Sequence, residues 1–181
     1  MQDGKTEIRA WSPDAVPEAL SALADILHAC VHDGASIGFV LPFSVADALA
    51  YWGSAVLPRV ESGERVLLLA SVDGRIVGTA QLDFAAMPNQ RHRADVMKVL
   101  VHPGARRRGI ARALMLALED RARAAGRTLL TLDTRTGDAA EPLYVSLGYQ
   151  VAGRIPGYAR NPFTPELDST TILYKRLSGP V

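Results

Sequence analysis

The chain has 181 residues, of which 48% are hydrophobic and 22% charged, and its formal net charge at pH 7 is +1. These values are typical of a soluble globular protein, and the length suffices for one domain with a core, so we expect a single domain over residues 1–181. The near-neutral charge gives no argument for binding to nucleic acid or to a membrane. A single cysteine, Cys30, excludes a disulfide framework and a cysteine-rich metal site.

The histidines and the N-terminal segment add neither a metal site nor a membrane segment. His28, His92 and His102 lack the spacing of metal ligands. The segment Met1–Thr6 is polar, and no apolar run approaches the roughly 20 residues of a membrane-spanning helix. We therefore expect a cytoplasmic protein without a bound metal.

Apolar periodicity and turn residues predict an alternation of strands and helices. In chain order, they are a strand at Thr6–Ala10, a helix from Pro13 to about Val31, a helix at about Ser44–Val60, strands at Glu64–Val72, Arg75–Phe84 and Ala94–Val101, a helix ending near Ala125, a strand at Thr128–Asp133, a helix at about Ala139–Leu147, and strands at Tyr149–Ile155 and Thr170–Leu177. Ser12 is expected to cap the first helix, Asp73-Gly74 to form a two-residue hairpin, and Gly126 to end the central helix.

The most informative pattern is Arg106-x-x-Gly109-x-Ala111, which lies between an apolar strand and a helix. Free N–H groups at a helix start, with arginines beside them, bind anions. No Lys-Ser or Lys-Thr pair follows, and the glycine spacing differs from that of a dinucleotide fold. These exclusions leave a pyrophosphate cradle of the kind that holds coenzyme A. The alternative is an arginine-rich helix start that only meets solvent.

This pattern resembles the Gln/Arg-x-x-Gly-x-Gly/Ala signature of the GNAT N-acetyltransferase superfamily. A strand ending in Val101-His102-Pro103 precedes it, and the family-like segment Ala140–Tyr149 follows at the expected place. The resemblance implies acetyl-CoA as cosubstrate. The residues that it implies around this cofactor are Val99, Leu100, Val101, Arg106, Arg107, Arg108, Gly109, Ile110, Ala111 and Arg112.

The same resemblance implies the α/β (α+β) fold of that superfamily. Its sheet is mixed and mostly antiparallel, with helices on both faces. One parallel pair of strands, the central strand and the strand after the cradle helix, splays apart to admit the pantetheine arm. One departure is Gly137, where many relatives have an asparagine that contacts the pantetheine.

Acetyl transfer to an amine requires a base for the amine, an oxyanion donor and a proton donor for the thiolate. The base candidates are Asp95, near the start of the central strand, and Asp133, at the end of the next strand. The alternatives are an exposed strand-end charge for Asp95 and a turn or cap residue for Asp133. The resemblance makes Tyr144 the acid, although a half-buried helix aromatic would look the same. A backbone N–H near Val99 to Val101 would serve the oxyanion.

Several segments resemble one branch of the superfamily in particular, the tabtoxin-resistance acetyltransferases. They are Val31–Phe39, Ala80–Leu82, Arg93–Val96, Leu132–Thr134 and Ile155–Tyr158. This resemblance implies a small-molecule amine as acceptor and a homodimer. The loop at Gly34–Phe39 and a turn at Pro156–Tyr158 would wall the acceptor pocket, with Ser36, Phe39 and Tyr158 as substrate residues.

His32 is a weaker candidate for the acceptor site, and a helix C-terminal cap is its alternative role. Lys98 interrupts an apolar strand, on the face opposite Met97, Val99 and Val101, where it would snorkel to the sheet edge or pair with a carboxylate. We expect an acetyl-CoA-dependent N-acetyltransferase acting on a small toxin, antibiotic or amino-acid-like amine. A protein or peptide N-terminal acetyltransferase and a non-catalytic acyl-CoA-binding regulatory module are the alternatives.

Overall fold

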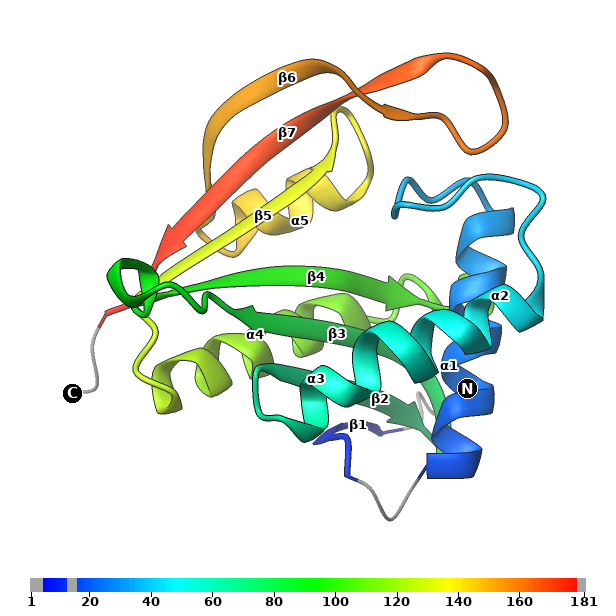
Figure 1. Ribbon diagram of the computed structural model, residues 1–181, viewed down its shortest axis with the longest axis horizontal. Helices are drawn as coiled ribbons and strands as arrows, with labels where there is room; N and C mark the ends of the chain where they lie inside the picture. The colour runs from blue at the N-terminus through cyan, green and yellow to red at the C-terminus, as the bar shows by residue number, and fades with distance from the viewer. Residues whose placement is uncertain (1–4, 13–15, 179–181) are drawn as a thin grey trace.

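The computed structural model describes residues 5–12 and 16–178 of the chain (Figure 1). Helix α1 is described over Val16–His32, and the predicted helix start at Pro13 lies outside the described residues. The strands are β1 (Thr6–Ala10), β2 (Arg65–Val72), β3 (Arg75–Phe84), β4 (Arg93–Val101), β5 (Leu129–Arg135), β6 (Gln150–Arg160) and β7 (Leu167–Arg176).

These strands form one mixed sheet in the order β1-β2-β3-β4-β5-β7-β6. Of the strand pairs in the described chain, β4–β5 is the parallel one, and its neighbours are antiparallel. The predicted Asp73-Gly74 hairpin is confirmed, because both residues have positive φ between β2 and β3. The predicted mixed, mostly antiparallel sheet is therefore confirmed.

The predicted second helix is helical throughout, but it is not one regular helix. It comprises α2 (Val45–Ala50), a π-helical turn at Tyr51–Val56 and α3 (Leu57–Glu61). Ser44 begins it with a capping box, as its side chain accepts from the Asp47 N–H and the Asp47 carboxylate accepts in return. Within the π-helical turn, buried Trp52 donates from Nε1 to the Leu23 carbonyl at 2.9 Å, which ties this segment to α1.

Side-chain alternation along the sheet divides the core into two layers. Leu68 and Ala70 of β2 pack with α4 (Ile110–Ala124) and α5 (Ala140–Ser146). Leu67 and Leu69 face the other way and pack with α1, α2 and the π-helical turn. Helices thus cover both faces of the sheet, as predicted (Figure 1).

The parallel pair is joined only at its beginning. Register partners are Arg93 with Leu129, Ala94 with Leu130 and Asp95 with Thr131. Beyond them β4 stays with β3, whereas β5 stays paired with β7, and the two strands diverge (Figure 1). The splay opens the sheet between strands that are adjacent at their other end.

A bulge in β4 sets the position of Lys98. Thr79 pairs with Leu100 and Gln81 with Met97, so Lys98 and Val99 together stand opposite one residue of β3. Lys98 has φ of +48°, in the left-handed region. Lys98 Nζ lies beside the rings of Phe39 and Tyr51, in the core layer of α1 and α2. Val99 and Val101 pack in the other layer, so these two valines lie on the opposite face as predicted. Lys98 does not reach the sheet edge but lines the cavity. The sequence pattern contains no signal for this bulge.

The predicted turn at Pro156–Tyr158 is also wrong. These residues belong to β6, which continues to Arg160 rather than ending at Ile155. Their pairing with β7 is irregular, since the register shifts between Ile155 and Ala159. Proline is tolerated because β6 is the edge strand of the sheet, where a missing N–H breaks no inner ladder.

Candidate functional site

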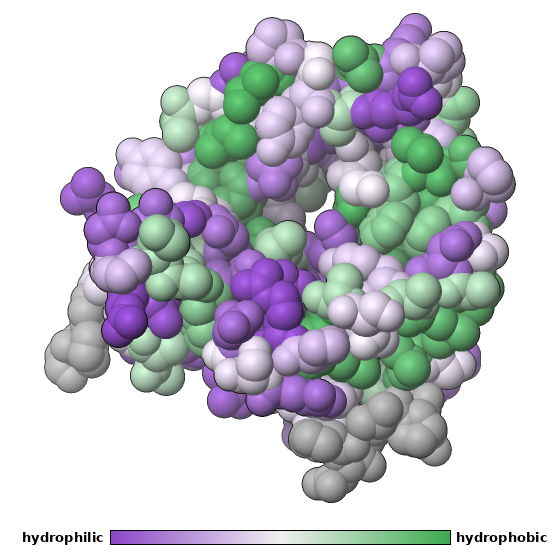
Figure 2. Space-filling model, viewed as in Figure 1, coloured by the Kyte–Doolittle hydropathy of each residue, from purple (hydrophilic) through white to green (hydrophobic). Residues whose placement is uncertain are grey.

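A cavity of about 960 Å³ occupies the gap between the splayed strands. Figure 2 shows the molecule hollowed at its centre. The cavity is lined by the end of β4, the end of β5, the start of α4, the loop at residues 33–38 and parts of α5, β6 and β7. Its size is that of a pocket for a cofactor or a drug-sized ligand.

The turn from β4 into α4 presents a run of free backbone N–H groups to this cavity. Arg107 and Gly109 have φ of +64° and +74°, and α4 begins at Ile110. Within the described part of the chain, no protein acceptor takes the N–H groups of residues 107–112. A Cβ built on Gly109 would meet no protein atom within 4 Å, so the space above the turn is open. The turn is therefore suited to hold an anion.

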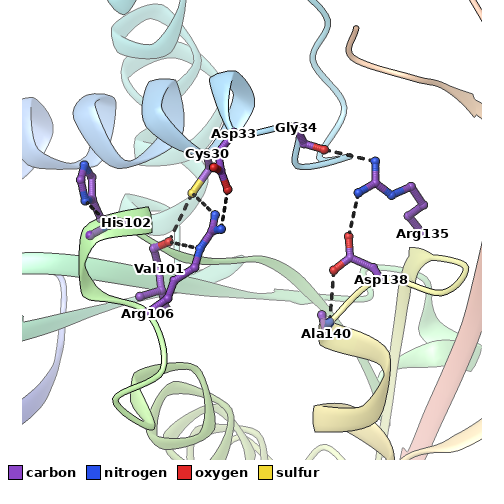
Figure 3. Close-up of polar contacts among 10 residues, drawn as sticks. Cys30, Asp33, Gly34, Val101, His102, Arg106, Arg135, Asp138 and Ala140 are labelled. Carbon is purple, nitrogen blue, oxygen red and sulfur yellow. Dashed lines mark hydrogen bonds and ion pairs between the residues drawn. The ribbon is translucent and has the colours of Figure 1, made fainter. Parts of the chain in front are cut away.

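Nine of the ten predicted cofactor residues line the cavity, and Arg108 does not. Two of the arginines that line the cavity, Arg106 in the turn and Arg112 in α4, are already oriented by protein contacts. Arg112 donates to the Ser146 hydroxyl at 2.7 Å, which joins α4 to α5. Arg106 donates to the Val101 carbonyl at 3.3 Å and to the Asp33 carboxylate at 2.5 Å (Figure 3). Arg106 thus links the turn to the end of α1.

Two of the three predicted catalytic residues line the same cavity. Asp133 lies on β5 beyond the splay, with an exposed carboxylate that accepts from the Thr170 hydroxyl at 3.1 Å. Tyr144 lies on α5 and is 7% exposed. Burial, with smaller effects from the charges of Asp138 and Asp133, raises the pKa of Tyr144 well above its usual 10. Its phenol therefore keeps its proton at neutral pH.

Asp95, the third, does not line the cavity. Its carboxylate accepts from Arg93 at 2.5 Å and from the Thr131 hydroxyl, at the joined end of β4 and β5. These contacts resemble the exposed strand-end charge that was its alternative role more than those of a base in the pocket.

The loop at residues 33–38, which we call the acceptor loop, lines the cavity, but only two of the four predicted acceptor residues do so. Ser36 and Tyr158 line the cavity, whereas His32 and Phe39 do not. His32 Nε2 lies 2.9 Å from the Phe43 carbonyl at the end of α1, consistent with its structural alternative. Phe39 packs instead against the rings of Phe43 and Tyr51.

Arg135 is a site residue that the sequence analysis missed. It donates to the Gly34 carbonyl at 3.2 Å and to the Asp138 carboxylate at 3.2 Å (Figure 3). The acceptor loop is therefore held on one side by Arg135 and on the other by the Arg106–Asp33 ion pair. The position of Arg135 directly after Leu132-Asp133-Thr134 was the only available signal.

The position of Gly137, where many relatives have asparagine, also lines the cavity. Its φ is +79°, and its N–H donates to the Glu141 carboxylate at 3.0 Å.

In residues 5–12 and 16–178, no helix is long and apolar enough to cross a membrane, and no three His, Cys, Asp or Glu side chains gather as metal ligands.

The comparisons with known proteins give acetyltransferases in each case. Residues 39–149 match the family model described as the acetyltransferase (GNAT) family. Over 126 residues the chain is 37% identical to an uncharacterized N-acetyltransferase from the hisH–hisA intergenic region of Azospirillum brasilense. The aligned segment covers 68% of this chain and 72% of that protein.

Solved structures share the fold over nearly the whole chain. The putative acetyltransferase yncA of Salmonella typhimurium, solved with acetyl-CoA, matches with a TM-score of 0.77 at 22% identity. This match covers 97% of this chain and 96% of the yncA chain. The ribosomal-protein-alanine N-acetyltransferase of Brucella melitensis has a TM-score of 0.76 at 24% identity and covers 94% and 99%. At these identities the likeness concerns the fold alone.

Proposed function

Because the chain belongs to the acetyltransferase (GNAT) family, we propose that it transfers an acetyl group from acetyl-CoA to the amino group of a small molecule. One observation carries this proposal. A single cavity joins a turn with free N–H groups at the start of α4 to the exposed Asp133 carboxylate and the Tyr144 phenol, whose raised pKa keeps it protonated. One cavity therefore offers space for the cofactor at the turn, for the reaction at Asp133 and Tyr144, and for the acceptor at the loop of residues 33–38.

The residues of the turn fit the phosphates of acetyl-CoA. The free N–H groups of residues 107–112 would bind the pyrophosphate, with Arg107 and Arg112 beside it. The gap between β4 and β5 would take the pantetheine arm, and Gly137 contributes no side chain there. Bound acetyl-CoA supplies the thioester that the amine attacks.

Asp133 is the proposed general base. Amines with a pKa of about 8 to 10 are mostly protonated at neutral pH and must lose a proton before they attack. The Asp133 carboxylate lines the cavity and is held by one hydrogen bond, from Thr170. The carboxylate therefore has free acceptor capacity for the incoming ammonium, directly or through a water.

Tyr144 is the proposed acid for the departing thiolate. Tyr144 is almost fully buried and lines the cavity. A phenol with a raised pKa remains protonated and can donate to the thiolate sulfur. For the oxyanion we propose the N–H of Val99, because the bulge takes Val99 out of register with β3.

The first test is thiol release from acetyl-CoA across a panel of small amines, amino acids, β-lactam amino acids and peptides. The proposal predicts turnover with at least one small amine, and its loss in Asp133→Asn. Turnover with peptides alone would replace the proposal by a peptide N-terminal acetyltransferase. Cofactor binding by calorimetry without turnover on any amine would favour a non-catalytic acyl-CoA-binding module.

The homodimer implied by the resemblance is part of the same proposal. The edge strand β6, the loop after it and the start of β7 carry exposed apolar side chains, namely Val151, Ile155, Tyr158, Phe163 and Leu167. An exposed apolar edge of this kind is typical of surfaces that associate. Sedimentation velocity across micromolar concentrations would show a dimer of this chain, and a monomer throughout would contradict the prediction.

A further inference from the structure

We propose that the ammonium of Lys98 binds a carboxylate of the acceptor, which makes the acceptor an amino acid or a close analogue. The inference rests on the proposed function, because it assigns the substrate class of the same cavity. It follows from the position of one cation that the mechanism above does not use. The bulge in β4 directs Lys98 to the cavity rather than to the sheet edge.

Two aromatic rings and a loop hold the Lys98 ammonium in place. Its Nζ lies 5.8 Å from the ring centres of both Phe39 and Tyr51, within the range of cation–π attraction. A Cβ built on Gly38 would lie 3.7 Å from the same nitrogen, so the acceptor loop passes directly beside it. Phe39, which does not itself line the cavity, thereby acts on the pocket through Lys98.

The Lys98 ammonium lacks a protein counter-ion within the described residues, in contrast to Arg135, another cation that lines the cavity. Arg135 is paired with Asp138 at 3.2 Å and with Asp168 at 3.6 Å. Within the described residues, no carboxylate lies within 4 Å of Lys98, and no hydrogen bond from Nζ is formed. A half-buried ammonium without an acceptor is costly, and an anionic ligand group would relieve that cost.

The electrostatics around Lys98 suit a zwitterion. Burial lowers the pKa of Lys98, the charge of Asp133 opposes that shift, and Arg65 adds to it. Lys98 and Asp133 are thus close enough to interact although they form no ion pair. An amino acid would place its carboxylate at Lys98 and its amine at Asp133, which complements both charges. A second cation on the acceptor, as in a diamine, would meet Lys98 and be repelled.

The test compares matched acceptors, each amino acid of the panel against its own α-amide. Amidation removes the negative charge and leaves the side chain and the amine in place. It also makes the amine less basic, so a preference for the acid cannot arise from easier deprotonation. We expect wild-type kcat/KM to favour the acids by about 10- to 100-fold, the range of a charge-assisted hydrogen bond.

Three variants separate binding from folding. Lys98→Met keeps an unbranched side chain at the same φ and should abolish the preference by raising KM for the acids. Lys98→Arg keeps the charge and should restore part of the preference, whereas a role in packing alone would give the same result for both variants. Lys5→Met, an exposed lysine before β1, is the matched control and should leave the preference unchanged.

The outcomes distinguish this inference from the proposed function. Turnover of acids and amides with equal kcat/KM, or a preference that survives Lys98→Met, overturns the role of Lys98 and leaves the acetyltransferase intact. If no amine is acetylated, calorimetry of the CoA-loaded protein with the N-acetyl amino acids decides. Binding that Lys98→Met weakens by about 10-fold or more supports the anion site, and equal or absent binding refutes it.

Discussion

The two ends of the cavity are built in different ways. The end proposed to hold the cofactor comes from one contiguous segment, the end of β4 followed by the turn and the start of α4, and it offers backbone N–H groups. The acceptor end gathers the loop at residues 33–38, Lys98, the end of β5 and parts of β6 and β7. Its contacts are side chains that lie far apart in the chain.

This difference predicts which end of the cavity tolerates amino-acid substitutions without a change in the ligand that it binds. A backbone cradle depends on φ and ψ at a few residues, so most side chains on it can vary without changing the cofactor. An acceptor pocket made of side chains on loops and edge strands changes specificity with each substitution. We therefore expect variants at the cofactor end to change CoA affinity and variants at the acceptor end to change acceptor kinetics.

Removing the proposed base should have the largest effect. Asp133→Asn leaves the turn and α4 untouched, so CoA affinity should be retained while kcat falls by about 10²- to 10⁴-fold. Asp73→Asn, in the exposed β2–β3 hairpin, is the matched control and should have wild-type kcat. Stopped assays of thiol release and calorimetry with CoA separate the two quantities. Parallel loss of both would contradict the division between the two ends.

Tyr144→Phe should lower kcat by about 10²-fold, at the low end for acid catalysis because a thiolate is a good leaving group. The pKa of Tyr144 is raised, so the phenol stays protonated below pH 10 and loses its proton only above it. The wild-type profile of kcat against pH should accordingly show no fall on the alkaline side up to about pH 10. A fall with a midpoint near pH 8 to 9 would assign the acid to another group.

Gly109→Val should weaken CoA binding by about 10- to 100-fold, as expected when the turn loses one charge-assisted hydrogen bond to the pyrophosphate. A β-branched residue is strained at φ of +74°, and its side chain would occupy the open space above the turn. Gly63→Val is an unusually close control, because Gly63 has φ of +76° and equally open surroundings.

Both glycine variants should lose about 1–2 kcal/mol of unfolding free energy to this strain. Chemical denaturation checks the stability, and calorimetry checks the affinity. Equal CoA affinity in the two variants would show that the turn does not hold the cofactor.

The smallest effect on stability and kinetics is expected from the Asp33–Arg106 ion pair, which links the two ends of the cavity. Asp33→Asn removes the ion pair with Arg106, whose partners are 47% and 41% exposed. Exposed pairs contribute little, so the unfolding free energy should fall by less than about 1 kcal/mol. The acceptor KM should rise slightly through the loosened loop, with CoA affinity unchanged. A large loss of CoA affinity would show that Asp33 orients Arg106 for the cofactor.

Local features were predictable because their causes are local. The Asp73-Gly74 hairpin requires two residues with positive φ, and the sequence places suitable residues there. The cradle likewise needs a glycine at the helix start, and Gly109 has the expected left-handed conformation. The roles of Asp133 and Tyr144 remain predictions, although their common position at the cavity agrees with them.

Features that depend on the pairing of distant strands could not be predicted in the same way. The position of Lys98 at the cavity, rather than at the sheet edge, depends on a register shift against β3. The strand at Pro156–Tyr158 exists because β7 offers it a partner at the sheet edge. The role of Asp95 stays a prediction from its spacing to Arg106, but its carboxylate is bound by Arg93 and Thr131 where β4 and β5 are still joined, and it does not line the cavity.

The sequence by itself determined the order of the elements, the turn proposed to hold the cofactor and the family, since each depends on contiguous residues whose backbone preferences are local. Only the tertiary structure decided which side chains share the acceptor pocket. That choice depends on strand register, on where β4 and β5 part, and on the ion pairs of Arg106 and Arg135 that hold the loop. These are contacts between residues far apart in the chain, for which spacing along the sequence carries no signal.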